Sequence, residues 1–187
     1  MATREEALSL LHEYVKSKGI RNHCYAVAAS MEAYAEKYKE DKDKWWICGL
    51  LHDFDYEKYP TIPEHTTEGV KILRNENYPE DIIEAILGHA EYTGVPRNSL
   101  MAKCLFALDE LSGFVVALAY VKQGFDMDAE SVKRALKKKG FAAAISREDI
   151  EKGITELRVN REEHFNLVIH ALEKIKEKLV LSTKLSS

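Results

Sequence analysis

The feature that most constrains the fold of this chain is a pair of polar side chains, His52 and Asp53, at the end of an apolar helical run. Burying an imidazole or a carboxylate without partners is costly, so a chain that buries both must bring other polar groups to them. Side chains of the same types recur on apolar faces of other predicted helices, at His23, His65, His89 and Asp109. Nitrogen and oxygen donors that converge from several helices of one bundle indicate a metal site.

Helical periodicity runs along the whole chain, whereas alternating β-branched runs bounded by turns are almost absent. Thr3 and Glu6 form a predicted capping box for a first helix that ends before Gly19. Apolar residues spaced by three and four predict a second helix up to Tyr38, and a third from about Asp43 to the His-Asp pair. Further helices are expected to begin near Thr61 (in a capping box with Glu64), Pro79, Asn98 or Ser99, Asp128, Ser146 and Asn160. The sequence therefore predicts an all-α protein.

The character of the sequence changes near Gly124. All six donors lie before this point, whereas the predicted helices after it are shorter, amphipathic or charged, and carry no cluster of ligand-type residues. We therefore expect a metal-binding helical core over residues 1–124 and a helical C-terminal extension over residues 125–187. The remaining histidines are expected on amphipathic surfaces outside the donor pattern: His12, His164 and His170.

Composition limits the class of protein. With 187 residues, a hydrophobic fraction of 45% and a charged fraction of 31%, the chain can form one globular domain with a substantial core. The net charge of −4 gives no support for binding a nucleic-acid polymer. Cys24, Cys48 and Cys104 are in no CxxC spacing, so we expect a reducing compartment and neither a disulfide scaffold nor a zinc ribbon. Cys48, four residues before His52, is expected to be an unreactive core thiol.

Two observations predict a cytoplasmic protein that does not cross a membrane. The N-terminal segment carries acids from Glu5 onward and lacks the apolar stretch of a signal peptide. The most apolar stretch, residues 100–121, is interrupted by Lys103, Asp109 and Glu110, which an ordinary bilayer span would exclude.

The order of the donors resembles that of the HD-domain superfamily of metal-dependent phosphohydrolases, over roughly residues 20 to 120. The minimal pattern of that superfamily is a histidine, a His-Asp pair and a distant aspartate, and its two-metal variants add two histidines before the last aspartate. The matching residues are His23, His52, Asp53, His65, His89 and Asp109. The resemblance implies an HD-domain helical bundle that binds one or two divalent transition-metal ions, with Fe, Mn, Co, Ni or Zn as candidates. It also implies that Asp53 bridges the ions and is the catalytic residue.

Residues 83–91 also resemble the superfamily, but one departure restricts the substrate. Members that degrade cyclic dinucleotides place a second histidine directly after the equivalent of His89, and then a GYP motif. Here Ala90 follows His89, and no GYP motif is present. This difference argues against cleavage of cyclic dinucleotides.

The resemblance implies hydrolysis of a small phosphoester, in a nucleotide or a related metabolite, so the expected partner is a small phosphorylated substrate. Arg97, in the loop after His89, and Lys103 are the candidates for binding its phosphate. Asp55 and Glu91 are candidates for proton transfer, although acidic residues at such positions more often lie on the surface without a catalytic role. The oligomeric state stays open.

Two other functions are compatible with the same residues. The six-donor pattern also resembles superfamily members that use two iron ions to oxidise a C–H bond, and both reactions need the same ligands. The second alternative is a non-catalytic sensor or partner-binding module, with residues 126–187 as its interaction surface. Dependence on iron together with oxygen uptake would distinguish the oxygenase from the hydrolase.

Overall fold

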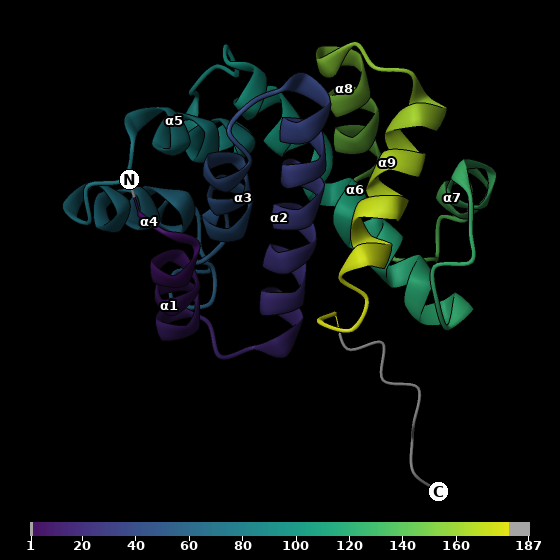
Figure 1. The fold of residues 1–187 in the computed structure, drawn as a ribbon, viewed down its shortest axis with the longest axis horizontal. Helices are drawn as coiled ribbons and strands as arrows, with labels where there is room; N and C mark the ends of the chain where they lie inside the picture. The colour runs from purple at the N-terminus through teal and green to yellow at the C-terminus, as the bar shows by residue number, and fades with distance from the viewer. Residues whose placement is uncertain (1, 180–187) are drawn as a thin grey trace, which may run out of the picture.

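Helices form the regular structure of residues 2–179, the part of the chain that the computed structural model describes (Figure 1). In chain order they are α1 (Arg4–Tyr14), α2 (Lys18–Tyr38), α3 (Lys42–Leu51), α4 (Glu64–Asn75), α5 (Glu80–His89), the 3₁₀ helix η1 (Glu91–Thr93), α6 (Leu100–Lys122), α7 (Ala129–Leu136), α8 (Arg147–Leu157) and α9 (Arg161–Lys174). Residues 2–179 contain no strand. The prediction of an all-α protein is confirmed.

The two longest helices, α2 and α6, lie in the middle of the molecule between two groups of shorter helices (Figure 1). On one side, α3 packs against α2, and α5 packs against α6. On the other side, α8 packs against α6, and α9 packs against both central helices. Because α2 and α6 are covered on both sides, one hydrophobic core cluster includes residues from both groups.

The helices after α6 contribute to this core rather than covering it loosely. Ile150 of α8 and Phe165 of α9 are buried in the same cluster as Leu50 of α3. Helices that bury apolar faces against α2 and α6 gain the same hydrophobic stabilisation as any core element. The hydrophobic core thus includes residues from both sides of residue 124. The expected division of the chain near that residue stays a prediction.

Most of the predicted helix starts are present with the expected capping hydrogen bonds. Thr3 and Glu6 form the capping box of α1, with both reciprocal bonds made. Four further predicted caps each accept a hydrogen bond from a backbone N–H of the first turn: Ser99, Asp128, Ser146 and Asn160. Side chains of this kind satisfy N–H groups that lack a partner at a helix start, which is why the sequence reveals them.

Two local predictions are wrong. Gly19 lies inside α2 rather than after α1, because Ser17 caps a new helix that begins at Lys18. Thr61 does not cap α4, because the N-cap of that helix is Pro63. The Thr61 hydroxyl donates instead to the Glu64 carboxylate. In both cases a neighbouring residue takes the position that the local pattern assigned.

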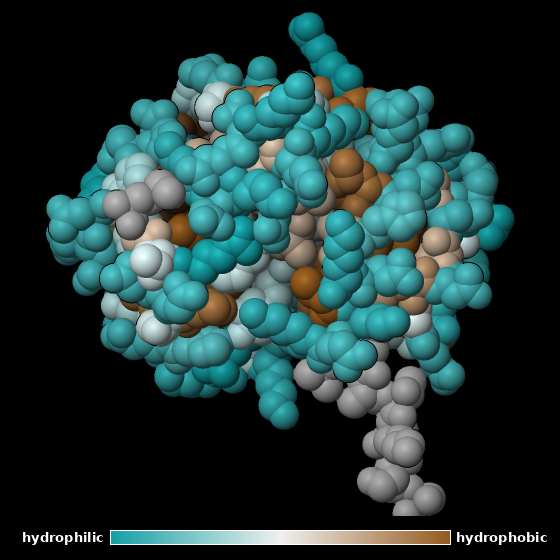
Figure 2. Space-filling model, viewed as in Figure 1, coloured by the Kyte–Doolittle hydropathy of each residue, from teal (hydrophilic) through white to brown (hydrophobic). Residues whose placement is uncertain are grey.

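α6 is the only helix in residues 2–179 that is long and apolar enough to cross a membrane by length and composition. In its most apolar window, 67% of the residues are buried inside the molecule, and a central core helix passes the same test. Hydrophilic residues cover most of the face seen in Figure 2, where hydrophobic residues show in small separate groups.

Candidate metal centre

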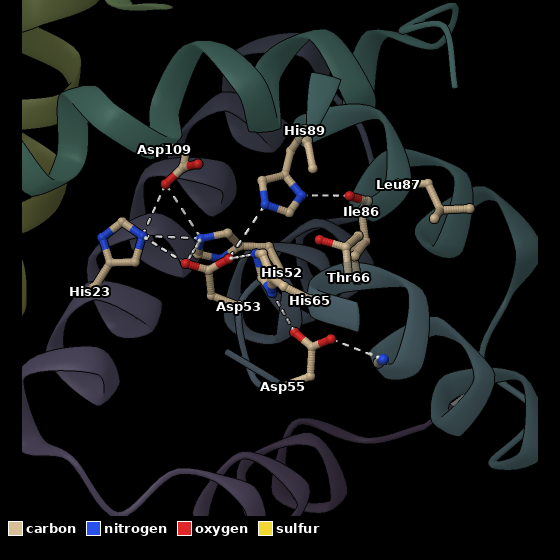
Figure 3. Close-up of polar contacts among 12 residues, drawn as sticks. His23, His52, Asp53, Asp55, His65, Thr66, Ile86, Leu87, His89 and Asp109 are labelled. Atoms are coloured by element: carbon tan, nitrogen blue, oxygen red, sulfur yellow. Dashed lines mark hydrogen bonds and ion pairs between the residues drawn. The ribbon is translucent and has the colours of Figure 1, made fainter. Parts of the chain in front are cut away.

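Six polar side chains meet where α2, α3, α4, α5 and α6 come together (Figure 3). They are the residues that the sequence predicts as metal ligands: His23, His52, Asp53, His65, His89 and Asp109. The donor atoms form two groups, and within each group all of them lie within 4.8 Å of one another. The sequence prediction that these residues converge is therefore met, while their binding of metal stays a prediction.

The first group consists of His23, His52 and Asp109. The two histidine Nε2 atoms lie 3.1 Å apart, and Oδ1 of Asp109 lies 2.9 Å from Nε2 of His23 and 3.4 Å from Nε2 of His52. Donors bound about 2.1 Å from one ion lie about 3.0–3.4 Å from each other in octahedral or tetrahedral geometry. The spacing of this group is thus that of ligands around a single ion.

Asp53 is shared between the two groups. Its Oδ2 atom lies 3.7 Å from Nε2 of His23 and 3.4 Å from Nε2 of His52. Its Oδ1 atom lies 3.3 Å from Nε2 of His65 and 3.4 Å from Nε2 of His89. One carboxylate oxygen therefore faces each pair of imidazoles, which is the arrangement of a carboxylate that bridges two ions.

Hydrogen bonds on the far side of three rings fix which nitrogen faces the centre. Nδ1 of His52 donates to the carbonyl of Gly49 (2.8 Å), and Nδ1 of His89 donates to the carbonyl of Ile86 (2.5 Å). Nδ1 of His65 lies 2.9 Å from Oδ1 of Asp55. A neutral imidazole with its proton on Nδ1 presents a lone pair on Nε2, as a metal ligand must. The donor set therefore fits divalent transition metals.

A close helix contact places the first group. An added Cβ on Gly49 would lie 2.9 Å from Cα of Ala28 and from the carbonyl oxygen of Val27, so glycine lets α3 approach the α2 backbone. His52 follows three residues later as the C-cap of α3, opposite His23 of α2. The chain turns directly after it, which lets Asp53 face the same centre although adjacent residues on a helix point about 100° apart.

A distorted turn places His65. Inside α4, His65 has φ −52° and ψ 142°, and Thr66 has φ 66° and ψ −46°, a positive-φ conformation that is unusual for a β-branched residue. The Tyr92 hydroxyl donates to the His65 carbonyl (2.9 Å) and lies 3.1 Å from Oγ1 of Thr66. Strain of about 1–3 kcal/mol is typical of such a residue, and it clusters at functional sites. The sequence placed His65 on a regular helical face with Gly69, and that local geometry is wrong.

Asp55 is a component of the centre that sequence reasoning misjudged. The expectation of a surface acid is wrong, because Asp55 is 1% exposed. Its Oδ1 atom accepts from His65 and its Oδ2 atom accepts from the backbone N–H of Gly69 (2.9 Å). Glycine at position 69 leaves room for this carboxylate, since an added Cβ there would lie 2.6 Å from Oδ2 of Asp55. That contact joins two chain segments, so no local pattern reveals it.

Opposite charges dominate the electrostatics of the centre. Burial disfavours the charged form of His52, but Asp53 and Asp109 outweigh it and raise its pKa well above the ordinary value. Burial likewise disfavours charge on Asp53, yet His52 holds the pKa of that carboxyl well below its usual range. The pKa of His65 is raised to about 9, where Asp53 and Asp55 overcome desolvation. A cluster that stabilises protonated imidazoles in this way is a cluster that attracts cations.

The two predicted phosphate-binding residues lie elsewhere. Arg97 donates from Nε and Nη2 to the Glu156 carboxylate, both at 2.7 Å, and from Nη1 to the carbonyl of Gly88. Its charge is therefore paired, and it ties the loop before α6 to α8. Lys103 and Arg97 line a cavity of about 680 Å³ that none of the six donors lines. A role of either residue in substrate binding stays a prediction.

Of two further polar residues that were expected on the surface, Glu91 is exposed and His164 is buried. Glu91 is exposed, as expected, and pairs with Arg97 and Lys152. The expectation that His164 lies on an amphipathic surface is wrong, because its side chain is fully buried against Tyr34.

The C-terminal helices border the metal-ligand cluster on one side. The backbone N–H of Ser146, the N-cap of α8, donates to the Glu110 carboxylate next to Asp109 (3.1 Å). A Cβ placed on Gly113 would lie 3.6 Å from both Nδ1 of His23 and Cδ1 of Ile145. Burial, followed by repulsion from Asp109, raises the pKa of Glu110 to about 7. The loop before α8 thus forms part of the surroundings of the first group.

Comparison with known protein families agrees with this geometry. The family model described as HD domain matches residues 20–113, a range that includes all six donors. No solved structure matches the chain at a significant level. The chain belongs to the HD domain family, which includes metal-dependent phosphohydrolases.

Proposed function

From this family membership and the shared position of Asp53, we propose that the protein is a two-metal phosphohydrolase that acts on a small phosphoester. The observation that carries the proposal is that each carboxylate oxygen of Asp53 faces its own pair of imidazole Nε2 atoms, at 3.3–3.7 Å. A carboxylate shared in this way suits two neighbouring ions, and paired ions are typical of enzymes that transfer phosphoryl groups to water.

The residues of the chain would position the reaction. His23, His52 and Asp109 would hold one ion, His65 and His89 the other, and Asp53 would hold both. When bound, divalent ions polarise a phosphoryl oxygen and lower the pKa of water towards neutrality. The Nδ1 bonds of His52 and His89 to backbone carbonyls keep these rings from turning, so their Nε2 donors stay aimed at the centre.

Exposure indicates where a substrate would approach. The side chains of His23, Asp53 and Asp109 are 26%, 19% and 21% exposed, whereas that of His52 is completely buried. Within residues 2–179, no lysine or arginine forms a hydrogen bond or ion pair with any of the six donors. The negative charge of a phosphate would therefore be met by the ions rather than by a guanidinium clamp.

Aromatic side chains near His65 support an organic group of planar shape on the substrate. The Tyr56 ring lies 5.1 Å from the His65 ring, centroid to centroid, and the Tyr92 ring lies 6.5 Å from it. Both tyrosines are partly exposed, at 43% and 39%. Exposed aromatic rings stack on nucleobases. This feature favours a small nucleotide over a simple sugar phosphate.

The test is a phosphate-release assay on protein purified without oxygen and reloaded with Mn²⁺, Co²⁺, Ni²⁺ or Zn²⁺. We expect hydrolysis of at least one nucleotide or phosphomonoester in a panel, without iron and without oxygen. Activity that needs iron and consumes oxygen would overturn the proposal in favour of the oxygenase. Metal binding without turnover of any compound in the panel would favour the sensor.

A further inference from the structure

Asp55 is a buried acid that the proposed chemistry does not use directly. Its side chain is 1% exposed, and it makes no ion pair with lysine or arginine within the described chain. Its hydrogen-bond partners are Nδ1 of His65 and the backbone N–H of Gly69 (Figure 3). A buried carboxylate is costly unless its oxygens are hydrogen-bonded, and both oxygens of Asp55 are used in this way, one of them on His65.

His65 differs from the other histidines in what orients it. His52 and His89 donate from Nδ1 to backbone carbonyls one turn earlier, at Gly49 and Ile86, which are present whatever the side chains are. His65 sits in the distorted start of α4, where its partner is a carboxylate from a different chain segment. A carboxylate acceptor holds an imidazole proton on Nδ1 more strongly than a carbonyl does and makes Nε2 a better donor.

We propose that Asp55 is a positioning residue that makes the second ion position depend on one side chain. It holds the proton of His65 on Nδ1 and thereby directs the Nε2 lone pair at the ion position that His65 would share with Oδ1 of Asp53, which lies 3.3 Å from Nε2. Among the described residues, no hydrogen bond or ion pair joins Asp55 to His23, His52 or Asp109, so the first ion position should not depend on it. This inference rests on the proposed two-ion site and adds that the two positions are held by separate means.

The substitution Asp55→Asn tests this role with almost no change in volume. If the asparagine oxygen accepts from His65, its amide NH₂ faces the N–H of Gly69, and two donors oppose each other. If the amide is turned the other way, its NH₂ faces Nδ1 of His65, the imidazole proton moves to Nε2, and the metal-facing lone pair is lost. Either orientation weakens the second ion position.

The experiment titrates metal-free protein with Zn²⁺ by calorimetry and counts the bound zinc by elemental analysis after desalting. We expect two ions in the wild type, and in Asp55→Asn an unchanged first ion with a second ion bound roughly 10- to 100-fold more weakly. Glu57→Gln is the matched control, because Glu57 lies in the same loop and also accepts from backbone N–H groups, at Lys16 and Ser17. It should bind both ions as the wild type does.

A second variant reaches the same contact from the other side. In Gly69→Ala the new Cβ would lie 2.6 Å from Oδ2 of Asp55, so the carboxylate must move while its charge remains. We expect the same selective weakening of the second ion, with unchanged helical circular dichroism. Equal affinities in wild type and Asp55→Asn, loss of both ions together, or a wild type that binds one ion would each overturn the inference. No turnover is measured, so failure of the proposed hydrolysis leaves this result unaffected.

Discussion

Two fully buried histidines, one in each half of the molecule, have opposite electrostatic properties. His52, at the end of α3, lies 3.4 Å from carboxylate oxygens of both Asp53 and Asp109. His164, in α9, lies 2.5 Å from the Tyr34 hydroxyl and 3.3 Å from the carbonyl of Ala107. The carboxylates raise the pKa of His52, whereas burial, with a smaller contribution from the charge of Lys37, lowers the pKa of His164 to about 4.

The comparison shows that burial alone does not identify a metal ligand. His164 is a neutral link that joins α9 to α2 through Tyr34 and to α6 through Ala107, with both ring nitrogens occupied. His52 has one nitrogen bonded to a backbone carbonyl and the other directed at oxygen and nitrogen donors. A histidine becomes a candidate ligand when its second nitrogen faces other donors rather than a proton partner.

The largest effect is expected from the shared carboxylate. Asp53→Ala removes the donor that faces four imidazole nitrogens, so we expect loss of both bound ions and a fall in phosphate release of more than about 100-fold. Elemental analysis and the phosphate assay measure the two effects, and circular dichroism should still show a helical protein. His164→Gln serves as the comparison from the other half, and it should keep both ions. An Asp53→Ala protein that retains two ions would remove the basis for the site.

Acid should lower the free energy of unfolding through His164, the buried histidine without a carboxylate partner. The pKa of His164 in the folded protein is about 4, against an ordinary value of 6.5, so the unfolded chain binds the proton more tightly. This residue therefore lowers the free energy of unfolding as pH falls from about 6.5 to about 4, by up to about 3 kcal/mol. Urea unfolding of wild type and His164→Gln at pH 7 and pH 4.5 isolates the contribution, since other groups titrate alike in both. Identical pH dependence in the two proteins would contradict it.

Two glycines offer a matched pair of helix contacts. A Cβ on Gly49 would lie 2.9 Å from Cα of Ala28, between α3 and α2, and a Cβ on Gly153 would lie 2.6 Å from Cα of Ala107, between α8 and α6. We expect Gly49→Ala and Gly153→Ala each to lower the free energy of unfolding by about 1–3 kcal/mol. Zinc affinity should fall in Gly49→Ala alone, because that contact sets the distance between His23 and His52. Equal zinc affinities in the two variants would show that the contact between α3 and α2 does not control metal binding.

The smallest effect concerns the phenol that holds His164. Tyr34→Phe removes the hydroxyl and leaves Nδ1 of His164 buried without a partner. We expect a loss of about 1 kcal/mol in the free energy of unfolding, with unchanged zinc stoichiometry. Thermal unfolding and elemental analysis on the same preparation measure both quantities. A change in bound zinc would show that the two halves are coupled through α2.

Much of this molecule could be predicted from the sequence. Side chains that cap helix starts, such as Thr3, Ser99 and Asn160, act within one turn, so their pattern is visible in the sequence. The all-helical class follows from apolar spacing, which depends on the helix period alone. The six donors could be selected because polar residues on apolar faces are costly to bury, and the structure brings all of them together.

The parts that could not be predicted depend on contacts between distant segments. Asp55 and His164 were both expected on the surface, and both are buried because another part of the chain covers them. The positive φ of Thr66 occurs where the Tyr92 hydroxyl, 26 residues further along, lies 3.1 Å from Oγ1 of Thr66. Sequence spacing does not reveal such partners.

By itself, the sequence determined the helical class, most of the helix caps and the set of candidate donors, because each depends on local geometry or on the cost of burying a polar group. Only the tertiary structure decided how those donors divide. It placed one oxygen of Asp53 against each pair of imidazoles, and it gave His65 a carboxylate partner where His52 has a backbone carbonyl. The physical reason is that hydrogen-bond partners and separations of about 3 Å are set by how helices pack.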